Sequence, residues 1–161
     1  MRRCPSRAWL GVAFGRGGKV IPVGLTLPDA AIVRIFDDHG EVIGAGFLAG
    51  PEIVITCAHV VADALGFDES TTDGPIGTRI QLDFPRVKPG HTVHSEVVRW
   101  HRLEGDGSGD LAGLKLVEPV PAGAGPLRLV ERDDLRNSRY RAFGFSVPTG
   151  AWSSGWIMGR Q

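Results

Sequence analysis

The chain has 161 residues, and its 18 basic and 18 acidic side chains give a formal net charge of zero. A balanced charge provides no electrostatic basis for binding nucleic acid or an anionic membrane surface. Hydrophobic residues make up 42% of the chain, enough for a globular core, and no run approaches the roughly 20 apolar residues that a membrane span needs.

The amino-terminal residues 1–28 show no clean hydrophobic period and are predicted to form a flexible leader. Met1–Phe14 resembles a signal peptide in its basic start and short apolar run. Glycines then interrupt the run and no small-x-small cleavage site follows, so secretion is the less favoured alternative. The two cysteines, Cys4 and Cys57, form neither a disulfide framework nor a zinc-binding pattern. A reducing, cytoplasmic setting is therefore expected.

Short strands joined by turns are predicted after the leader. Gly40 ends the polar turn Asp37–Gly40 and is free to adopt positive φ. Gly44 and Gly46 lie within a predicted strand, where glycines indicate a tight bend or a close approach of another backbone. The first three strands are predicted at Ala31–Phe36, Val42–Leu48 and Ile53–Thr56.

The next segment begins with a short helix and continues with three more strands. Val60–Gly66 reads as one or two helical turns that end at the glycine. The later strands alternate apolar and polar residues, and they are predicted at Ile80–Phe84, Val93–Trp100 and Leu111–Leu116. Six short antiparallel strands with 23 glycines and 11 prolines in the chain fit a small closed barrel.

A linker and a second strand system follow the predicted barrel. Residues 119–138 are rich in proline, glycine and alanine at their start and are interpreted as a linker. Tyr140–Phe145 and Ser154–Met158 are predicted as strands, so residues 139–161 would begin a second unit.

His59 and Asp110 are the candidate catalytic residues. His59 follows a buried strand and opens a short helical segment, which places its side chain at a strand end. Asp110 precedes a strand that buries Ala112, Leu114 and Leu116 on one face. Histidine serves as a base because its unperturbed pKa is near 6.5, and a carboxylate that accepts its Nδ1–H fixes the tautomer. The alternative for an isolated histidine is a purely structural role.

Other polar residues are weaker candidates. Gly105–Asp110 resembles a Gly-Asp-Ser-Gly nucleophile motif, but the extra Gly107 breaks it, so Ser108 is interpreted as a loop residue. Asp106 is a rival to Asp110, yet no apolar strand follows it directly. Ser153 and Ser154 lack the downstream glycine of a nucleophile motif and are predicted to lie in a hairpin.

No metal site is predicted. His91 and His94 lie close in sequence, but no carboxylate or cysteine has metal-like spacing to them. Cys57 lies two residues before His59 and is interpreted as a small core residue rather than a reactive thiol.

Three motifs in a consistent order carry a family resemblance. Gly44–Leu48 looks like a Gly-x-Gly-Phe strand, Thr56–Val61 looks like Thr-Ala-Ala-His, and Asp110–Leu116 looks like Asp-Ile-Ala-Leu-Leu. Together they resemble the trypsin-like, or chymotrypsin-fold, serine peptidases, especially the bacterial branch that includes HtrA-like enzymes. The resemblance covers about residues 30–158.

The resemblance implies an all-β, two-barrel fold. Residues 29–118 would form the first, six-stranded antiparallel barrel, with His59 as general base and Asp110 as the residue that orients it. Residues 139–161 would be the first strands of a truncated second barrel. In this family the second barrel supplies the nucleophilic serine, the oxyanion-hole amides and the specificity pocket. These parts are expected beyond Gln161, so no nucleophile is assigned within the chain.

The resemblance therefore predicts the amino-terminal portion of a serine endopeptidase that acts on polypeptides, with no cofactor and little activity on its own. Two alternatives stay open. One is a non-catalytic, peptidase-like binding module or gene-fragment remnant. The other is one half of a split protease, completed by a second chain.

Overall fold

The computed structural model describes residues 10–13, 27–68, 74–129, 139–145 and 152–158. Within these ranges the chain is mostly β, with short helices α1 (Leu27–Ala31) and α2 (Ala58–Leu65). The described strands are β1 (Leu10–Ala13), β2 (Ile32–Phe36), β3 (Val42–Leu48), β4 (Ile53–Thr56), β5 (Arg79–Phe84), β6 (Lys88–His101), β7 (Leu111–Leu116), β8 (Arg139–Phe145) and β9 (Trp152–Met158).

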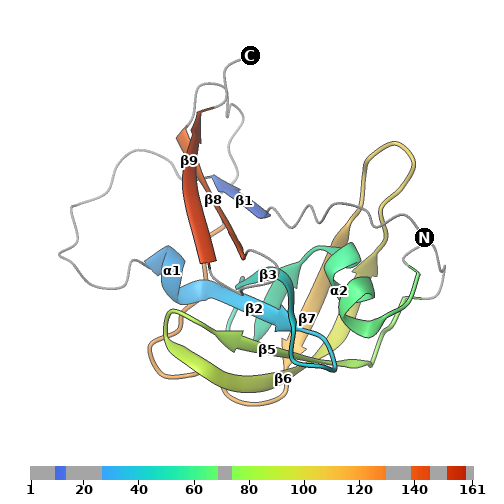
Figure 1. Cartoon of the computed structure of the whole chain (residues 1–161), viewed down its shortest axis with the longest axis horizontal. Helices are drawn as coiled ribbons and strands as arrows, with labels where there is room; N and C mark the ends of the chain where they lie inside the picture. The colour runs from blue at the N-terminus through green and yellow to red at the C-terminus, as the bar shows by residue number, and fades with distance from the viewer. Residues whose placement is uncertain (1–9, 14–26, 69–73, 130–138, 146–151, 159–161) are drawn as a thin grey trace.

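Six of these strands close into an antiparallel barrel, as the sequence predicted. Their order around the barrel is β2-β3-β4-β7-β6-β5, and pairing of β5 with β2 closes it. Figure 1 shows the barrel with α2 against one side and the remaining strands beyond the opposite side. A closed barrel leaves no free strand edge among its members.

Alternating side chains of the barrel strands fill its interior. Ile35, Leu82 and Leu114 are fully buried, and each belongs to a different strand. The helix α2 contributes Val60 and Val61 to the same cluster. The helix that carries His59 therefore packs on the core and is held against the barrel by apolar contacts.

The turn between β2 and β3 has the predicted chemistry. The Asp37 carboxylate accepts hydrogen bonds from the backbone N–H groups of His39 and Glu41, at 2.9 and 2.8 Å. Gly40 has φ of 80°, a conformation in which a side chain would be strained. This local bonding is the reason that the short polar segment reverses the chain.

Three barrel strands begin elsewhere than predicted, of which β5 differs by one residue and starts at Arg79. The first starts at Ile32, because residues up to Ala31 form the short helix α1. The strand predicted at Val93–Trp100 is longer and starts at Lys88. Residues 88–92 are all exposed, so this end of β6 carries no apolar alternation that sequence reasoning could detect.

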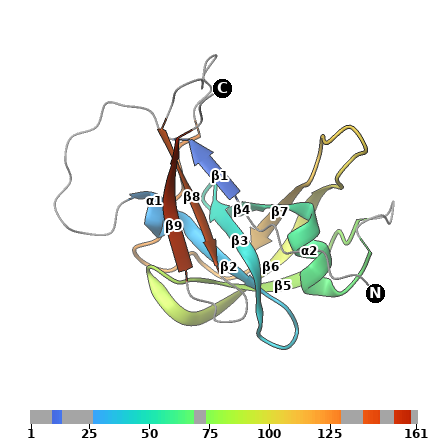
Figure 2. The same cartoon turned by 45° about the horizontal axis from the view of Figure 1, so that its top comes forward.

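A separate three-stranded sheet has the order β1-β8-β9. Its strand β1 pairs with β8, with Leu10 opposite Phe143, and thus takes four residues from the predicted leader. A strand of four residues shows no measurable period, and its partner lies far along the chain, so no local pattern predicts it. Figure 2 shows this sheet beside the barrel. Leader residues 1–9 and 14–26 and linker residues 130–138 lie outside the described residues, whereas residues 27 and 28 of the predicted leader begin α1.

Neither described helix is long and apolar enough to cross a lipid bilayer.

Candidate active site

The backbone at the end of β4 places His59 in the first turn of α2. Thr56, the last residue of β4, is fully buried, and its hydroxyl donates a 2.8 Å hydrogen bond to the carbonyl of Ala45 in β3. Cys57 then has extended dihedral angles (φ −79°, ψ 147°) as the N-cap, and the helix begins at Ala58. Gly66, with φ of 68°, ends the helix in the left-handed conformation that glycine favours.

The two glycines of β3 let α2 and β4 approach closely. A Cβ at Gly44 would lie 2.6 Å from a methyl group of Val60 in α2, and a Cβ at Gly46 would lie 2.8 Å from the carbonyl oxygen of Ile55. Of the two predicted alternatives, a tight bend or a close backbone approach, Gly46 shows the close backbone approach, while Gly44 lies against a side chain. These contacts set how near His59 sits to the barrel.

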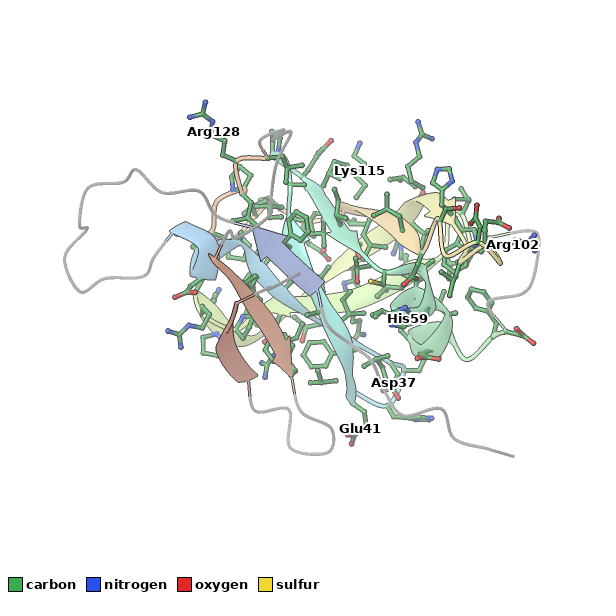
Figure 3. All side chains as sticks on the ribbon, turned by 90° about the horizontal axis from the view of Figure 1, so that it is seen from above. Asp37, Glu41, His59, Arg102, Lys115 and Arg128 are labelled. Carbon is green, nitrogen blue, oxygen red and sulfur yellow. The ribbon has the colours of Figure 1, made fainter. Side chains whose placement is uncertain are left out.

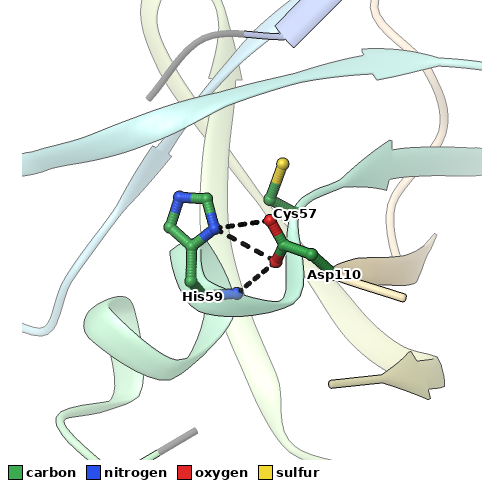
Figure 4. A group of neighbouring side chains, drawn as sticks. All are labelled: Cys57, His59 and Asp110. Atoms are coloured by element: carbon green, nitrogen blue, oxygen red, sulfur yellow. Dashed lines mark hydrogen bonds and ion pairs between the residues drawn. The ribbon is translucent and has the colours of Figure 1, made fainter. Parts of the chain in front are cut away.

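Asp110 is positioned by an unusual backbone conformation between β6 and β7. Gly109 has φ of 85°, and Asp110 follows with φ of 53°, the one non-glycine residue with positive φ in the described chain. Aspartate tolerates the left-handed region better than most residues. The two consecutive left-handed residues turn the chain into β7 and direct the Asp110 carboxylate toward α2 (Figure 4).

The structure brings His59 and Asp110 into direct contact. His59 Nδ1 lies 2.9 Å from Asp110 Oδ2 and 3.0 Å from Oδ1, and the backbone N–H of His59 donates to Oδ1 at 3.0 Å (Figure 4). The Cys57 side chain makes no capping bond, so the carboxylate satisfies an N–H that the first turn of a helix leaves without a partner. A negative charge at this end of the helix is also favourable. We refer to His59 and Asp110 as the dyad.

This geometry defines what the imidazole can do. With the carboxylate accepting from Nδ1–H, the proton of the neutral ring is held on Nδ1, and Nε2 keeps its lone pair. No described residue forms a hydrogen bond with Nε2. The His59 side chain is 29% exposed. The ring can therefore accept a proton at Nε2 while Asp110 stabilises the resulting cation.

Cys57 lies beside the dyad. Its environment raises the pKa of the thiol to about 11, mainly through burial and then through the charge of Asp110 and a hydrogen bond to it. The thiol is therefore protonated near neutral pH and is a poor nucleophile. It packs at the edge of the hydrophobic core, half-buried, in agreement with the interpretation as a small core residue.

Asp106 and Ser108 form a local turn and do not take part in the dyad. The backbone N–H of Ser108 donates to Asp106 at 2.9 Å, and the carbonyl of Ser108 accepts from Glu104. Bonds from the hydroxyl and then the backbone N–H of Ser108 lower the pKa of Asp106 below its usual value. Both residues are exposed. Of the two candidate carboxylates, the structure places Asp110 against His59.

Ser153 and Ser154 lie in a strand and not in the predicted hairpin. Both belong to β9, opposite Gly144 and Phe143 of β8. Figure 1 shows β9 and α2, the helix that carries His59, on different sides of the molecule. The strand conformation arises because β9 pairs with β8 along its whole length.

A second histidine–carboxylate pair has nearly the same geometry. His94 Nδ1 lies 3.0 Å from Glu118, which also accepts the backbone N–H of His94 at 2.7 Å. The hydrogen bonds from His94 lower the pKa of Glu118. These side chains are more exposed than the dyad, at 43% and 42%, and no cysteine joins them in the described chain. A histidine–carboxylate contact alone thus does not distinguish a catalytic site.

Comparison with known families separates the two pairs. The profile of the family described as Trypsin-like peptidase domain matches residues 44–160. The chain belongs to this family. Trypsin-like peptidases are the group that the motifs around His59 and Asp110 resemble, whereas no such motif surrounds His94. Comparison with curated protein sequences finds no match.

Two solved structures share the fold. Rv3671c from M. tuberculosis H37Rv, a Ser343Ala mutant in its inactive form, is 21% identical with a TM-score of 0.50, and the match covers 79% of this chain. Neuropsin, a serine protease of mouse brain, is 11% identical with a TM-score of 0.54 and 84% coverage. This trypsin-like chain spans 51% and 61% of those two chains. At these identities the likeness establishes the fold alone.

Proposed function

We propose that this chain provides the general base His59 and its orienting residue Asp110 to a serine endopeptidase, and that the nucleophilic serine comes from outside the 161 residues. One observation carries the proposal: Asp110 holds Nδ1 of His59 and its backbone N–H together, and leaves Nε2 without a partner among the described residues. Membership of the trypsin-like family supports polypeptides as the substrate class.

The proposed mechanism uses His59 twice. As the serine oxygen attacks the scissile carbonyl carbon, its proton moves to Nε2, and the Asp110 carboxylate stabilises the imidazolium. The same proton then passes to the departing amine, which leaves an acyl-enzyme. Water attacks the acyl group in the second half, with His59 again accepting a proton. Donors for the oxyanion are not assigned to any described residue.

The serine assignment rests on sequence and placement together. The chain contains no Gly-x-Ser-Gly segment. Ser108 lies in an exposed turn, and Ser153 and Ser154 lie on β9, away from the side that carries His59 (Figure 3). A chain without an acyl acceptor should hydrolyse peptides near the uncatalysed rate.

A fluorophosphonate probe, which labels activated serines, tests the proposal. The probe is applied to the 161-residue chain and to the longest natural translation product that contains it. We expect no labelling of the first and labelling of the second. His59→Ala should lower that labelling by at least about 10³-fold, because the serine loses its base. The matched control is His94→Ala, which removes the other carboxylate-paired histidine and should leave labelling unchanged.

Each contrary outcome has a distinct meaning. Labelling of the isolated chain would show that one of its own serines is activated. Labelling that survives His59→Ala would remove His59 from the mechanism. If the natural product is never labelled, the better interpretation becomes a non-catalytic binding module or half of a split protease that a second chain completes.

A further inference from the structure

Three different metal-binding groups converge at the start of α2. Sγ of Cys57, a ring nitrogen of His59 and a carboxylate oxygen of Asp110 all lie within 4.8 Å of one another (Figure 4). The three residues are half-buried. Dyad chemistry does not require the thiol, because catalysis by a histidine and a carboxylate involves only the ring and the oxygens. Cys57 is therefore the feature that the proposed function leaves unexplained.

This donor set suits a zinc ion. Zinc accepts thiolate, imidazole and carboxylate ligands at about 2.0–2.3 Å in tetrahedral geometry, which places neighbouring ligand atoms about 3.3–3.8 Å apart. The Nδ1–Oδ2 distance of 2.9 Å would lengthen slightly, and the other ligand separations, none above 4.8 Å, would shorten by no more than about 1.5 Å. Small side-chain rotations accomplish both. Three protein ligands leave the fourth position open for water.

We propose that Cys57, His59 and Asp110 bind a Zn²⁺ ion that holds the dyad in an inactive tautomer. The binding site stands on the convergence of the three ligands alone. Its regulatory meaning rests on the function proposed above.

The inactive tautomer follows from which ring nitrogen of His59 faces Cys57 and Asp110. Nδ1 is the nitrogen beside Asp110, so it is the nitrogen that the metal would bind. When zinc binds Nδ1, the single proton of the neutral ring moves from Nδ1 to Nε2 through solvent, and the one proton released is that of the Cys57 thiol. A protonated Nε2 donates a hydrogen bond and cannot accept the proton of a serine. Removal of the ion restores the lone pair on Nε2.

The fold offers both access and a natural comparison. The side chains of His59 and Asp110 are 29% and 23% exposed, so an ion can enter from solvent. His94 and Glu118 have the same contacts without a thiol. Two ligands bind zinc far less tightly than three, so the second pair should not compete.

Cobalt(II), a spectroscopic substitute for zinc, tests the site without any activity assay. The titration uses the full chain carrying Cys4→Ser, so that Cys57 is its one thiol. We expect one Co²⁺ per chain, with a thiolate-to-cobalt charge-transfer band and the intense visible bands of tetrahedral coordination. Cys57→Ala should remove the charge-transfer band and weaken binding by at least about 100-fold. The family motif Thr-Ala-Ala-His, which Thr56–Val61 resembles, has alanine at the position of Cys57. Circular dichroism checks that the variant folds. The control variant Glu118→Gln should change neither the charge-transfer band nor the affinity for cobalt.

Nitrogen NMR with Zn²⁺ tests whether the bound ion holds the His59 ring in the inactive tautomer. We expect zinc to shift Nδ1 of His59 and to place the proton on Nε2. A folded chain that gives no charge-transfer band, or a band that survives Cys57→Ala, would overturn the site. Zinc bound through Nε2 would overturn the inactive tautomer but would leave the proposed metal-binding site standing. Because these readouts need no serine, their failure is distinguishable from failure of the peptidase proposal.

Discussion

Replacing Asp83 by alanine is expected to lower the free energy of unfolding by about 3–5 kcal/mol. The Asp83 side chain is fully buried in the barrel wall and accepts bonds from Arg34 Nε at 2.9 Å and from the backbone N–H of Gly90 at 2.9 Å. A second Arg34 nitrogen completes a bidentate ion pair. Alanine would leave the guanidinium without its carboxylate, and an uncompensated, partly buried charge is costly.

The ion pair also connects the barrel to the second sheet. The Arg34 guanidinium lies 5.5 Å from the ring centre of Phe36 and 6.0 Å from that of Phe145 in β8. The hydrogen bond to Asp83 is the main reason that the pKa of Arg34 is raised, against the opposing effect of burial. Loss of Asp83 should therefore weaken the packing of β8 on the barrel as well.

Urea unfolding of the wild-type chain and its variants measures this effect. Glu52→Ala is the matched control, because the exposed pair of Lys115 and Glu52, at 3.3 Å, should contribute no more than about 1 kcal/mol. The double variant Arg34→Met with Asp83→Leu should recover most of the loss, since an apolar pair leaves no buried charge. An Asp83→Ala variant as stable as Glu52→Ala would refute the assignment.

The substitution Gly109→Ala is expected to separate Asp110 from His59. A Cβ at Gly109 would lie 2.0 Å from the carbonyl oxygen of Arg102, a backbone atom that cannot move alone, and φ is 85°. The loop must shift, and it carries Asp110 at its next position. In a complete peptidase, loss of the orienting carboxylate should reduce kcat by about 10⁴-fold.

Gly107→Ala is the control for this substitution. Gly107 has nearly the same φ, 84°, but a Cβ there would meet no atom within 4 Å. Gly107→Ala should lower the free energy of unfolding only by the conformational strain, about 1–2 kcal/mol, and should leave the contact between His59 and Asp110 intact. NMR of the His59 ring nitrogens compares the two variants. Equal spectra for both would show that the tight packing of Gly109 does not position Asp110.

Apolar alternation and the family motifs predicted the barrel because each strand buries one face. Ala112, Leu114 and Leu116 alternate along β7, and all three are buried. By contrast, the four-residue strand β1 and the exposed start of β6 carry no such pattern, and β1 pairs with β8, which lies far along the chain. Local sequence cannot report pairing that tertiary contacts decide.

The candidate site was predictable in its residues but not in its surroundings. The motifs identified His59 and Asp110, and the structure places them in contact. The left-handed conformation of Asp110 had no sequence signal beyond the glycine before it. The approach of Cys57 to the pair was also hidden, because spacing rules for metal ligands look for neighbours in sequence, whereas Asp110 comes from a different loop.

The protonation of the His59 ring tests the central claim most directly. The measurement is nitrogen NMR of this chain, with a chelator present and at a pH at which the ring is neutral. The dyad predicts a proton on Nδ1 and a free lone pair on Nε2. In Asp110→Asn, the backbone N–H of His59 should hold the amide oxygen, so that the amide NH₂ faces Nδ1 and the proton moves to Nε2. A wild-type ring that already carries its proton on Nε2, or one that Asp110→Asn leaves unchanged, would contradict the account.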